Sequence, residues 1–260
     1  MLTNPGSDRV RSVRGLSRRP VRRRTGRLLV EGPQGVREAV RFAPHDVVDL
    51  YVTAEAADRY ADVVHDAREA GRFVHEVSEE VLAAMCDAEH PQGMAAVVGW
   101  QPAGLDDVLA AGPRTLVFLT NVRDPGNLGT VVRGADAAGA DAVLVSGSSV
   151  DVTAPKVVRS TVGSLFHVPV VTGLDVPTTL ASLREAGVST YDADGSGSAS
   201  VDEVDRTRPH AWVMGNEAWG LPDELLRACD EVVRVPIYGH AESLNLAMAA
   251  TLCLYASTRA

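Results

Sequence analysis

The chain has 260 residues, of which 45% are hydrophobic and 23% are charged, and its formal net charge at pH 7 is −9. These values are typical of a globular protein with a hydrophobic core, and they exclude collagen-like, mucin-like and wholly disordered chains. The most apolar stretch, residues 246–256, is about half as long as the roughly 20 residues that span a bilayer, so we expect no transmembrane segment.

The N-terminal basic segment, residues 1–27, contains nine arginines and a single acidic residue. Arginine presents planar donors to phosphate, so this segment predicts salt-sensitive binding to RNA. Two alternatives stay open, an organelle transit peptide and a solvated tail. A secretory signal is not expected, because only three apolar residues follow the arginines. The arginines that we expect to contact RNA are Arg18, Arg19, Arg22, Arg23 and Arg24.

Short apolar runs alternate with helical patterns between residues 28 and 100. The predicted strands are 28–31, 47–53, 73–77 and 94–99, and the predicted helices are 34–42, 56–70 and 79–86. A break rich in Pro and Gly follows at residues 101–104 and indicates a domain boundary. We therefore predict a small α/β domain over residues 28–100 and a linker over 101–113, which includes a short helix at 105–111.

The second half of the chain repeats this alternation. The predicted strands are 115–120, 142–146, 168–171, 188–192, 211–214 and 231–235, and the predicted helices are 128–138, 155–162, 177–186, 222–228 and 244–258. Strands that are apolar throughout, such as 116–119, are typical of parallel sheets covered on both faces. The Gly- and Ser-rich residues 194–200 predict a flexible loop. The sequence thus predicts an α/β fold with a mostly parallel sheet in a domain over residues 114–260.

The first of three polar clusters, residues 121–133, follows a predicted buried strand and opens a helix. Ligands of parallel sheets bind at such strand ends. Pro125 and Gly126 favour a tight turn, and Arg133 shares a helix face with Gly129, four residues earlier. The cluster contains no phosphate-binding loop or dinucleotide fingerprint.

The other two clusters also follow predicted strands. In residues 213–222, Glu217 is an acid within a small apolar loop, with helix capping as the alternative, and we expect Trp219 in the core. In residues 235–247, we expect Ser243 to be the N-cap of the last helix, and Asn245 to be a buried amide that finds partners.

Together, and in this order, the three clusters resemble the three motifs of the SpoU/TrmH family of RNA ribose 2′-O-methyltransferases. The matching stretches are residues 121–133, 214–221 and 235–247. Residues 29–33 and 91–93 fit the ends of the family's small RNA-binding domain of ribosomal-protein L30e type. The resemblance implies a C-terminal SPOUT-type domain with a deep trefoil knot, a homodimer, and S-adenosylmethionine as cofactor.

The resemblance also implies the site residues. The cofactor would be held mainly by backbone groups of Thr120, Gly215, Asn216, Val235, Ile237, Ser243 and Leu244. The catalytic set would be Asn127, Arg133, Glu217, Ser243 and Asn245. A guanidinium group is rarely neutral, so we expect Arg133 to bind the phosphate beside the target ribose and to stabilise alkoxide character, and to act as a base only if its pKa is strongly perturbed.

Three alternatives are kept: a non-catalytic RNA-binding or ribosome-assembly factor, a transfer-RNA ribose methyltransferase, and an unrelated nucleotide-binding enzyme. Ribosomal RNA is favoured as substrate, because a separate N-terminal domain resembles the ribosomal-RNA members, including the thiostrepton-resistance type. The chemistry needs no metal, since the leaving group is a neutral thioether. The three widely spaced cysteines form no disulfide or zinc pattern, which favours the reducing cytoplasm.

Overall fold

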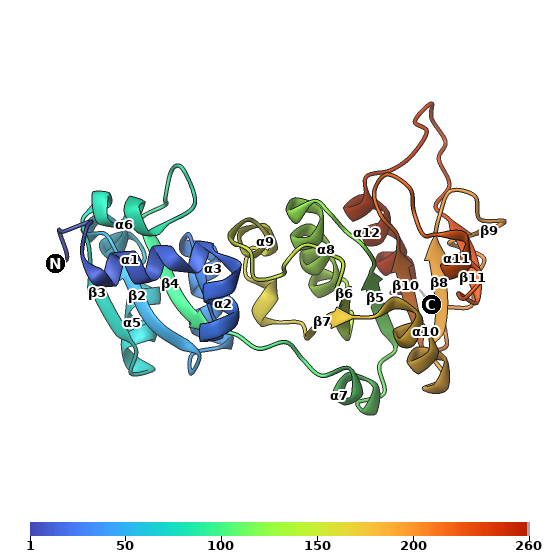
Figure 1. Ribbon diagram of the computed structural model, residues 1–260, viewed down its shortest axis with the longest axis horizontal. Helices are drawn as coiled ribbons and strands as arrows, with labels where there is room; N and C mark the ends of the chain where they lie inside the picture. The colour runs from blue at the N-terminus through green and yellow to red at the C-terminus, as the bar shows by residue number, and fades with distance from the viewer. Residues whose placement is uncertain (259–260) are drawn as a thin grey trace. The chain divides into compact units, whose positions relative to one another are not determined.

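The computed structural model describes residues 1–258, which divide into two compact units. The first unit comprises residues 1–101 and 151–167, and the second comprises residues 102–150 and the chain from 168 onward (Figure 1). The last two positions of the predicted 114–260 domain lie outside the described residues. Among residues 1–258, no helix combines the length and apolarity that crossing a membrane requires.

The first unit contains a four-stranded sheet in the order β1-β4-β2-β3. Its strands are β1 (Arg27–Glu31), β2 (Val47–Val52), β3 (Phe73–Glu76) and β4 (Met94–Gly99). Strand β4 is antiparallel to β1 and β2, whereas β2 and β3 are parallel. The helices are α3 (Pro33–Phe42), α4 (Ala54–Arg59), α5 (Ala61–Glu69) and α6 (Glu79–Met85). The predicted single helix at 56–70 is therefore wrong, because Tyr60 leaves helical geometry and divides it.

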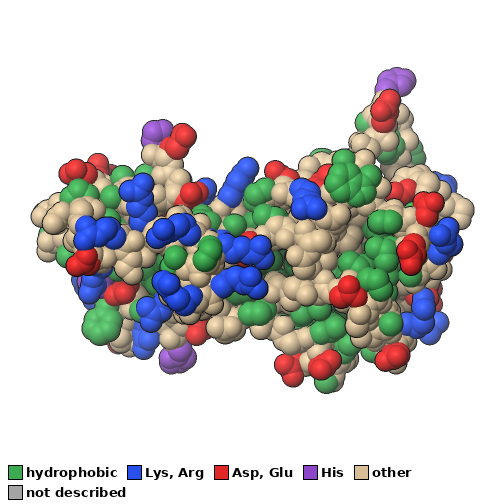
Figure 2. Space-filling view, viewed as in Figure 1, with side chains coloured by type: hydrophobic (Ala, Val, Ile, Leu, Met, Phe, Trp, Pro, Cys, Tyr) green, Lys and Arg blue, Asp and Glu red, His purple; other side chains and the backbone are tan. Residues whose placement is uncertain are grey.

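The N-terminal basic segment is folded into the first unit. It forms α1 (Asp8–Arg14), a 3-10 helix η1 (Gly15–Ser17) and α2 (Arg19–Thr25), and basic side chains gather over these helices (Figure 2). Val10, Val13 and Leu16 are buried in the same core as Tyr51 and Leu82. These apolar residues recur every third position, so they form one helical face that anchors the segment to the sheet.

A segment from the second half of the sequence also folds with the first unit. It carries α9 (Pro155–Thr161) and the 3-10 helix η2 (Ser164–Phe166). Arg159 on α9 pairs with Glu31 at 3.0 Å and with Asp87 at 3.0 Å. The compact units therefore differ from the division read from the sequence, both here and at residues 1–27.

The second unit is built on a seven-stranded sheet, parallel throughout, in the order β7-β6-β5-β10-β8-β11-β9. Its strands are β5 (Thr115–Leu119), β6 (Ala142–Ser146), β7 (Val170–Leu174), β8 (Ser189–Ala193), β9 (Ala199–Ser200), β10 (His210–Met214) and β11 (Glu231–Arg234). Its helices are α7 (Leu105–Ala110), α8 (Pro125–Ala137), α10 (Val176–Glu185), α11 (Asp223–Leu226) and α12 (Leu246–Ser257). The α/β prediction with a mostly parallel sheet is confirmed. The predicted loop at 194–200 is wrong at its end, because β9 pairs with β11.

The order of the strands places the site. From β5 the chain builds β6 and β7 on one side, and it later adds β10, β8 and β11 on the other, so the direction reverses between β5 and β10. Ligands of open α/β sheets bind at the carboxyl ends of strands at such a switch point. Helix α12 then packs against α8, β5 and β10. The close approach of α12 to α8 is made at Gly134, where an added Cβ would lie 2.8 Å from the Thr251 hydroxyl.

Candidate active site

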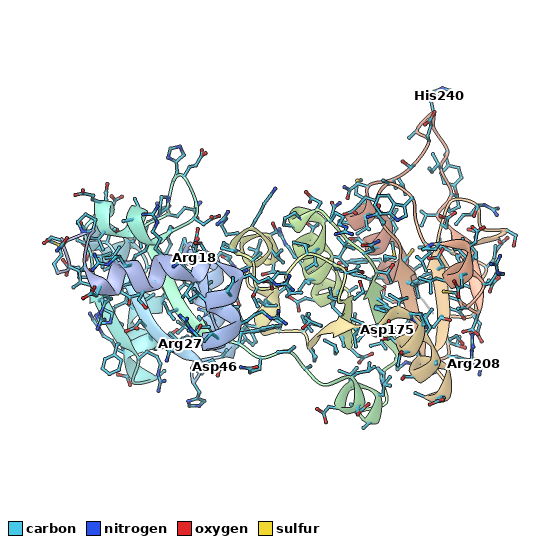
Figure 3. All side chains as sticks on the ribbon, viewed as in Figure 1. Arg18, Arg27, Asp46, Asp175, Arg208 and His240 are labelled. Atoms are coloured by element: carbon cyan, nitrogen blue, oxygen red, sulfur yellow. The ribbon has the colours of Figure 1, made fainter. Side chains whose placement is uncertain are left out.

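A cavity of about 450 Å³ opens at the carboxyl edge of the second sheet. It lies between the turn after β10, the loop after β11 and residues 193–195 after β8. Six of the seven predicted cofactor residues line it, namely Gly215, Asn216, Val235, Ile237, Ser243 and Leu244. The loop after β11 extends from the sheet, with His240 at its tip (Figure 3).

The seventh predicted cofactor residue, Thr120, does not line the cavity. It is buried at the end of β5, and both its backbone N–H and its hydroxyl donate to the Met214 carbonyl, at 2.9 and 3.0 Å. Thr120 therefore ties the end of β5 to the end of β10. It affects the cavity indirectly, because it positions Met214, which is part of the lining.

The turn after β10 has a tightly determined shape. Asn216 and Gly220 exchange two backbone hydrogen bonds, and the Asn216 side-chain amide donates to the Asn121 carbonyl at 2.8 Å. A Cβ on Gly215 would lie 2.4–2.7 Å from backbone atoms of Gly220 and Leu221. Only glycine therefore permits this turn to fold back on the strand that precedes it.

A polar network joins the three clusters. The Asn245 side-chain amide donates to Asn127 Oδ1 at 2.9 Å, and the Asn127 amide donates to Glu217 Oε1 at 3.2 Å. The Glu217 carboxylate also accepts the backbone N–H groups of Arg123 and Asp124. Partial burial would raise the pKa of Glu217, but these hydrogen bonds and one from its own amide outweigh burial and lower the pKa. Glu217 is thus held as a carboxylate that fixes the start of α8.

The structure corrects two expectations about the third cluster. The N-cap of α12 is Asn245, whose side-chain oxygen accepts from the backbone N–H groups of Ala247 and Met248. Ser243 is instead an exposed residue of the loop that lines the cavity. Asn245 is also exposed rather than buried, because the helix starts with it at the edge of the sheet. Both its side-chain oxygen and its side-chain amide nevertheless have hydrogen-bond partners, as expected.

Arg133 lies on α8, six residues after Asn127, which is about 9 Å along a helix axis. It is exposed and forms no hydrogen bond or ion pair with any residue that the structure describes. The structure therefore unites Asn127, Glu217 and Asn245 and leaves Arg133 outside their network. Its guanidinium keeps all its donors for an external anion.

The expectation that Trp219 belongs to the core is wrong. Trp219 is 60% exposed and lines the cavity, because the tight turn at 216–220 lifts it off the sheet. Sequence reasoning also missed Asp194 and Glu242, which line the same cavity. The available signal was the position of Asp194 at the start of the predicted loop 194–200, two residues after a predicted strand. Asp194, Glu217 and Glu242 are accompanied by no basic residue in the lining, so this cavity favours a cationic ligand.

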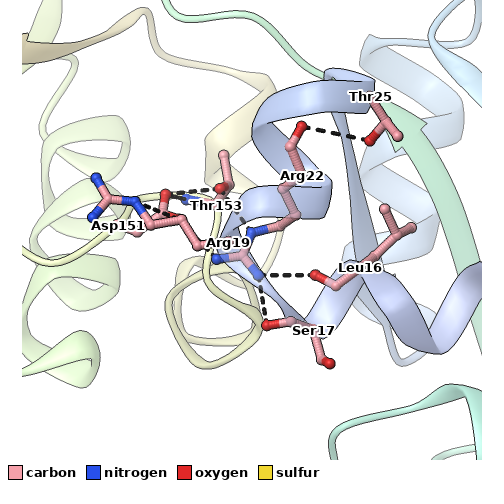
Figure 4. Close-up of polar contacts among 7 residues, drawn as sticks. All are labelled: Leu16, Ser17, Arg19, Arg22, Thr25, Asp151 and Thr153. Atoms are coloured by element: carbon pink, nitrogen blue, oxygen red, sulfur yellow. Dashed lines mark hydrogen bonds and ion pairs between the residues drawn. The ribbon is translucent and has the colours of Figure 1, made fainter.

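The five arginines predicted to bind RNA do not share one environment. Arg18, Arg19, Arg23 and Arg24 are exposed, but Arg22 is buried (Figure 4). Its guanidinium donates to the Asp151 carboxylate at 2.7 Å, to the Thr153 hydroxyl, and to the carbonyls of Leu16 and Ser17. Arg22 therefore holds η1, α2 and the segment before α9 together, and its donors are not available to RNA.

No group of His, Cys, Asp and Glu side chains in residues 1–258 is arranged to hold a metal ion. The three cysteines are unpaired thiols, and burial raises the pKa of each to about 12.

Comparison with known proteins gives two family matches. Residues 114–255 match the SpoU rRNA Methylase family, and residues 7–96 match the MRM3-like substrate binding domain. The chain is 35% identical over 236 residues to the 23S rRNA (guanosine-2′-O-)-methyltransferase RlmB of Bordetella pertussis, covering 89% of this chain and 96% of RlmB. It is 33% identical over 249 residues to the 23S rRNA (guanosine(2553)-2′-O)-methyltransferase RlmP of Bacillus subtilis, covering 96% and 95%.

Two solved structures are similar over nearly the whole chain. The AdoMet-bound rRNA methyltransferase from Sinorhizobium meliloti superposes with a TM-score of 0.85 at 30% identity, covering 99% of this chain and 97% of that one. The SpoU methyltransferase AviRb from Streptomyces viridochromogenes, in complex with AdoMet, gives a TM-score of 0.83 at 30% identity, covering 97% and 98%. The match to both extends beyond the second unit.

Proposed function

The chain belongs to the SpoU rRNA Methylase family, and we propose that it transfers a methyl group from S-adenosylmethionine to a ribose 2′-hydroxyl of ribosomal RNA. It is an S-adenosylmethionine-dependent RNA 2′-O-methyltransferase. The observation that carries this function is the junction of the three clusters, at which the Asn245–Asn127–Glu217 network lies at the same strand ends as the cavity. The relatives named as 23S rRNA methyltransferases support ribosomal RNA as the substrate.

The cavity fits S-adenosylmethionine in size and in charge. Its volume of about 450 Å³ lies within the range of small-molecule sites. The cofactor carries a sulfonium and an ammonium group, and the lining offers three carboxylates and no basic side chain. Bound there, the cofactor supplies an electrophilic methyl group. The residues that would hold it are Gly215, Asn216, Val235, Ile237, Ser243 and Leu244, with Thr120 positioning the Met214 end of β10.

The chain's own residues have to bring the ribose hydroxyl to that methyl group and to accommodate the charge that develops. Arg133 is free to bind the phosphate beside the target ribose and to stabilise alkoxide character, and its guanidinium stays charged. Asn127, Glu217 and Asn245 keep the start of α8 and the start of α12 in fixed positions relative to the turn after β10. Ser243, exposed at the cavity, contributes its hydroxyl and backbone to the same edge.

The homodimer is supported by an apolar stripe on α12. Met248, Leu252 and Tyr255 are 60%, 48% and 41% exposed, and their spacing places them on one helix face. Such a stripe on the last helix of a water-soluble enzyme fits a self-complementary interface with a second copy. We also propose the trefoil knot of this family, which is supported by the return of α12 to α8 and β5, elements formed more than a hundred residues earlier.

The exposed arginines Arg18, Arg19 and Arg24 support RNA binding by the first unit, whose residues 28–100 we propose to be the L30e-type domain. The mixed four-stranded sheet with helices around it is consistent with that type. A cytoplasmic location is proposed because the substrate is ribosomal RNA and the three cysteines are unpaired.

The test is transfer of labelled methyl from S-adenosylmethionine to unmodified transcripts of 23S rRNA, 16S rRNA and transfer RNA. We expect label on 23S rRNA, and a loss of about 100-fold or more in Arg133→Ala. Arg184→Ala, which removes an arginine that pairs with Asp230 near α11, is the control and should keep normal turnover. Cofactor binding without label on any RNA, on transcripts or on ribosomal particles, would contradict the proposal and favour an RNA-binding factor.

A further inference from the structure

A second cavity, of about 400 Å³, lies in the first unit between the N-terminal helices and the sheet. Its walls come from α1, η1 and α2 on one side and from β1, β2 and β4 on the other. Five arginines and a single acid line it: Arg9, Arg11, Arg18, Arg24, Arg27 and Asp49. We call this cavity the arginine groove. Its positive lining is exceptional in a chain whose net charge is −9.

Three of these arginines have no partner inside the part of the chain that the structure describes. Arg18, Arg24 and Arg27 are exposed and form no hydrogen bond or ion pair through their side chains with residues 1–258. The one acid of the lining, Asp49, already has two cationic or donor neighbours, with Arg9 at 3.6 Å and His75 at 2.7 Å. The groove therefore holds unneutralised positive charge that points at a common space.

The N-terminal elements that form the groove are held in place by their own contacts with the first unit. Val13 and Leu16 of the groove are buried in the core of the first unit. Arg18 lies over Gly15, where an added Cβ would be 3.6 Å from its guanidinium nitrogen. Buried Arg22 locks α2 to the carbonyls of residues 16 and 17 and to Asp151. The groove arginines thus extend from an ordered scaffold, and Figure 3 labels two of them, Arg18 and Arg27, which flank α2.

We propose that the arginine groove binds the backbone phosphates of an unpaired segment of the substrate RNA, an inference that rests on the proposed function. Guanidinium groups bind phosphate through paired donors, and positively charged grooves follow the backbone of single strands. A concave space with a volume of about 400 Å³ admits a single strand, whereas a duplex would present its phosphates to a broader surface. Exposed arginines of the same helices that do not line the groove, Arg14 and Arg23, take no part in this contact.

The experiment compares two double variants that remove the same charge from the N-terminal basic segment. Arg18→Ala with Arg24→Ala removes two groove arginines, and Arg14→Ala with Arg23→Ala removes two exposed arginines outside it. The probes are a fluorescein-labelled 12-nucleotide single-stranded RNA and a 12-base-pair RNA duplex, titrated with the full chain at several salt concentrations.

We expect the groove variant to weaken single-strand binding about tenfold or more and to reduce the slope of log K against log salt by about 1.4, the value for two lost phosphate contacts on a single strand. The control variant should change the Kd less than threefold. Equal losses in both variants would show that charge acts diffusely and would overturn the proposal, as would tighter binding of the duplex than of the single strand.

Two further measurements keep the result interpretable. Thermal unfolding of both variants should match that of the parent chain, because the four side chains have no partners among the described residues. The single variants Arg24→Gln and Arg23→Gln compare a groove arginine with its neighbour outside the groove and remove only one charge each. In methyl transfer, the groove variant should raise the KM for rRNA with kcat and cofactor Kd unchanged. Absence of methyl transfer by the parent chain would count against the proposed function, while the oligonucleotide contrast would still decide the groove.

Discussion

The arginine groove and the cofactor cavity are built by opposite means. In the groove, charged side chains project from the N-terminal helices, the residue between them and the start of β1, and each contributes a similar phosphate-binding group. In the cavity, the surface is made by the backbone of turns, and a network of two amides and one carboxylate fixes where those turns lie. The two lining charges also have opposite sign, positive in the groove and negative in the cavity.

The difference predicts how each region responds to substitution. Removing one groove arginine should remove only part of the RNA-binding free energy, since the other arginines remain. Removing one glycine or one network amide should change the geometry of the whole cavity, because the turns that it positions are shared.

The largest effect is expected at Arg22, the buried arginine of the N-terminal basic segment, whose guanidinium binds protein groups and holds neighbouring elements together. Arg22→Ala removes four hydrogen bonds and leaves the partly buried Asp151 carboxylate with only the longer ion pair to Arg19, at 3.5 Å. Breaking a buried ion pair by removing one partner destabilises by about 3–5 kcal/mol, and because Arg19 remains we expect a loss near the lower end of that range. Urea unfolding with hydrogen exchange at β1 and β4 measures this loss in the first unit.

Arg23→Ala is the matched control for Arg22, because the two arginines are adjacent on α2 and Arg23 is exposed. It should change the free energy of unfolding by less than about 0.5 kcal/mol. If both variants gave the same small change, the contact with Asp151 would not stabilise the first unit, and the distinction between the two arginines would fail.

In the cavity, Gly215→Ala should reduce S-adenosylmethionine affinity more than 100-fold. The added Cβ overlaps the backbone of Gly220 and Leu221, so the turn has to move and the cavity changes shape. Isothermal titration with the cofactor gives the Kd. Gly239→Ala, in the loop after β11 where an added Cβ meets nothing within 4 Å, should bind normally. Normal binding by Gly215→Ala would show that the turn relaxes without affecting the cavity.

The regular elements of the fold were predictable from periodicity. Strands β4 and β6 begin and end at the predicted residues, because continuous apolar runs bounded by turn formers leave little freedom. The helices of the N-terminal basic segment were not predicted, because its apolar face consists of only three residues and is hard to recognise among nine arginines. The charge of Arg22 could be read from the sequence, but its burial depends on Asp151 and Thr153, about 130 residues away.

The candidate site was located by the order of three motifs, and its geometry was not predictable from any one of them. Ser243 was expected to cap α12 because serine is a common N-cap, but the helix begins two residues later and Asn245 caps it. Trp219 was expected in the core because tryptophan is usually buried, whereas a five-residue turn exposes it. In both cases the tertiary position of a turn decided the outcome, and single-residue preferences do not carry that information.

A smaller effect is expected at Asp192, which lies in β8 two residues before Asp194 of the cavity lining. Its side chain is buried and neither oxygen has a hydrogen-bond partner among the described residues. Burial raises the pKa of Asp192 to about 7, and the charge of Asp194 adds to this. The folded chain therefore keeps a proton that the unfolded chain loses near pH 4, so stability is complete below pH 4 and is lost as pH rises through 7.

From pH 5 to pH 8 this group should lower the free energy of unfolding by on the order of 3 kcal/mol. Asp192→Asn should flatten the profile over that range, and the exposed control Glu185→Gln should leave it unchanged. Urea unfolding of the second unit at each pH is the measurement. Neighbouring thiols do not titrate there, because burial raises the pKa of Cys229 and Cys253 to about 12. An unaltered profile in Asp192→Asn would assign the pH dependence to other groups.

The smallest effect on stability, and the sharpest test of the network, is expected at Asn245. Its oxygen caps α12, whereas its amide donates to Asn127, so one side chain has two separable tasks. Asn245→Ala removes both interactions. It should lower the free energy of unfolding by about 1 kcal/mol, and it should also lower kcat for methyl transfer. Asn245→Asp keeps the capping oxygen but cannot donate, so stability should stay near that of the parent chain while kcat falls. If kcat instead followed stability in the two variants, Asn245 would act only as a cap, and the cavity would not depend on a network that joins its turns.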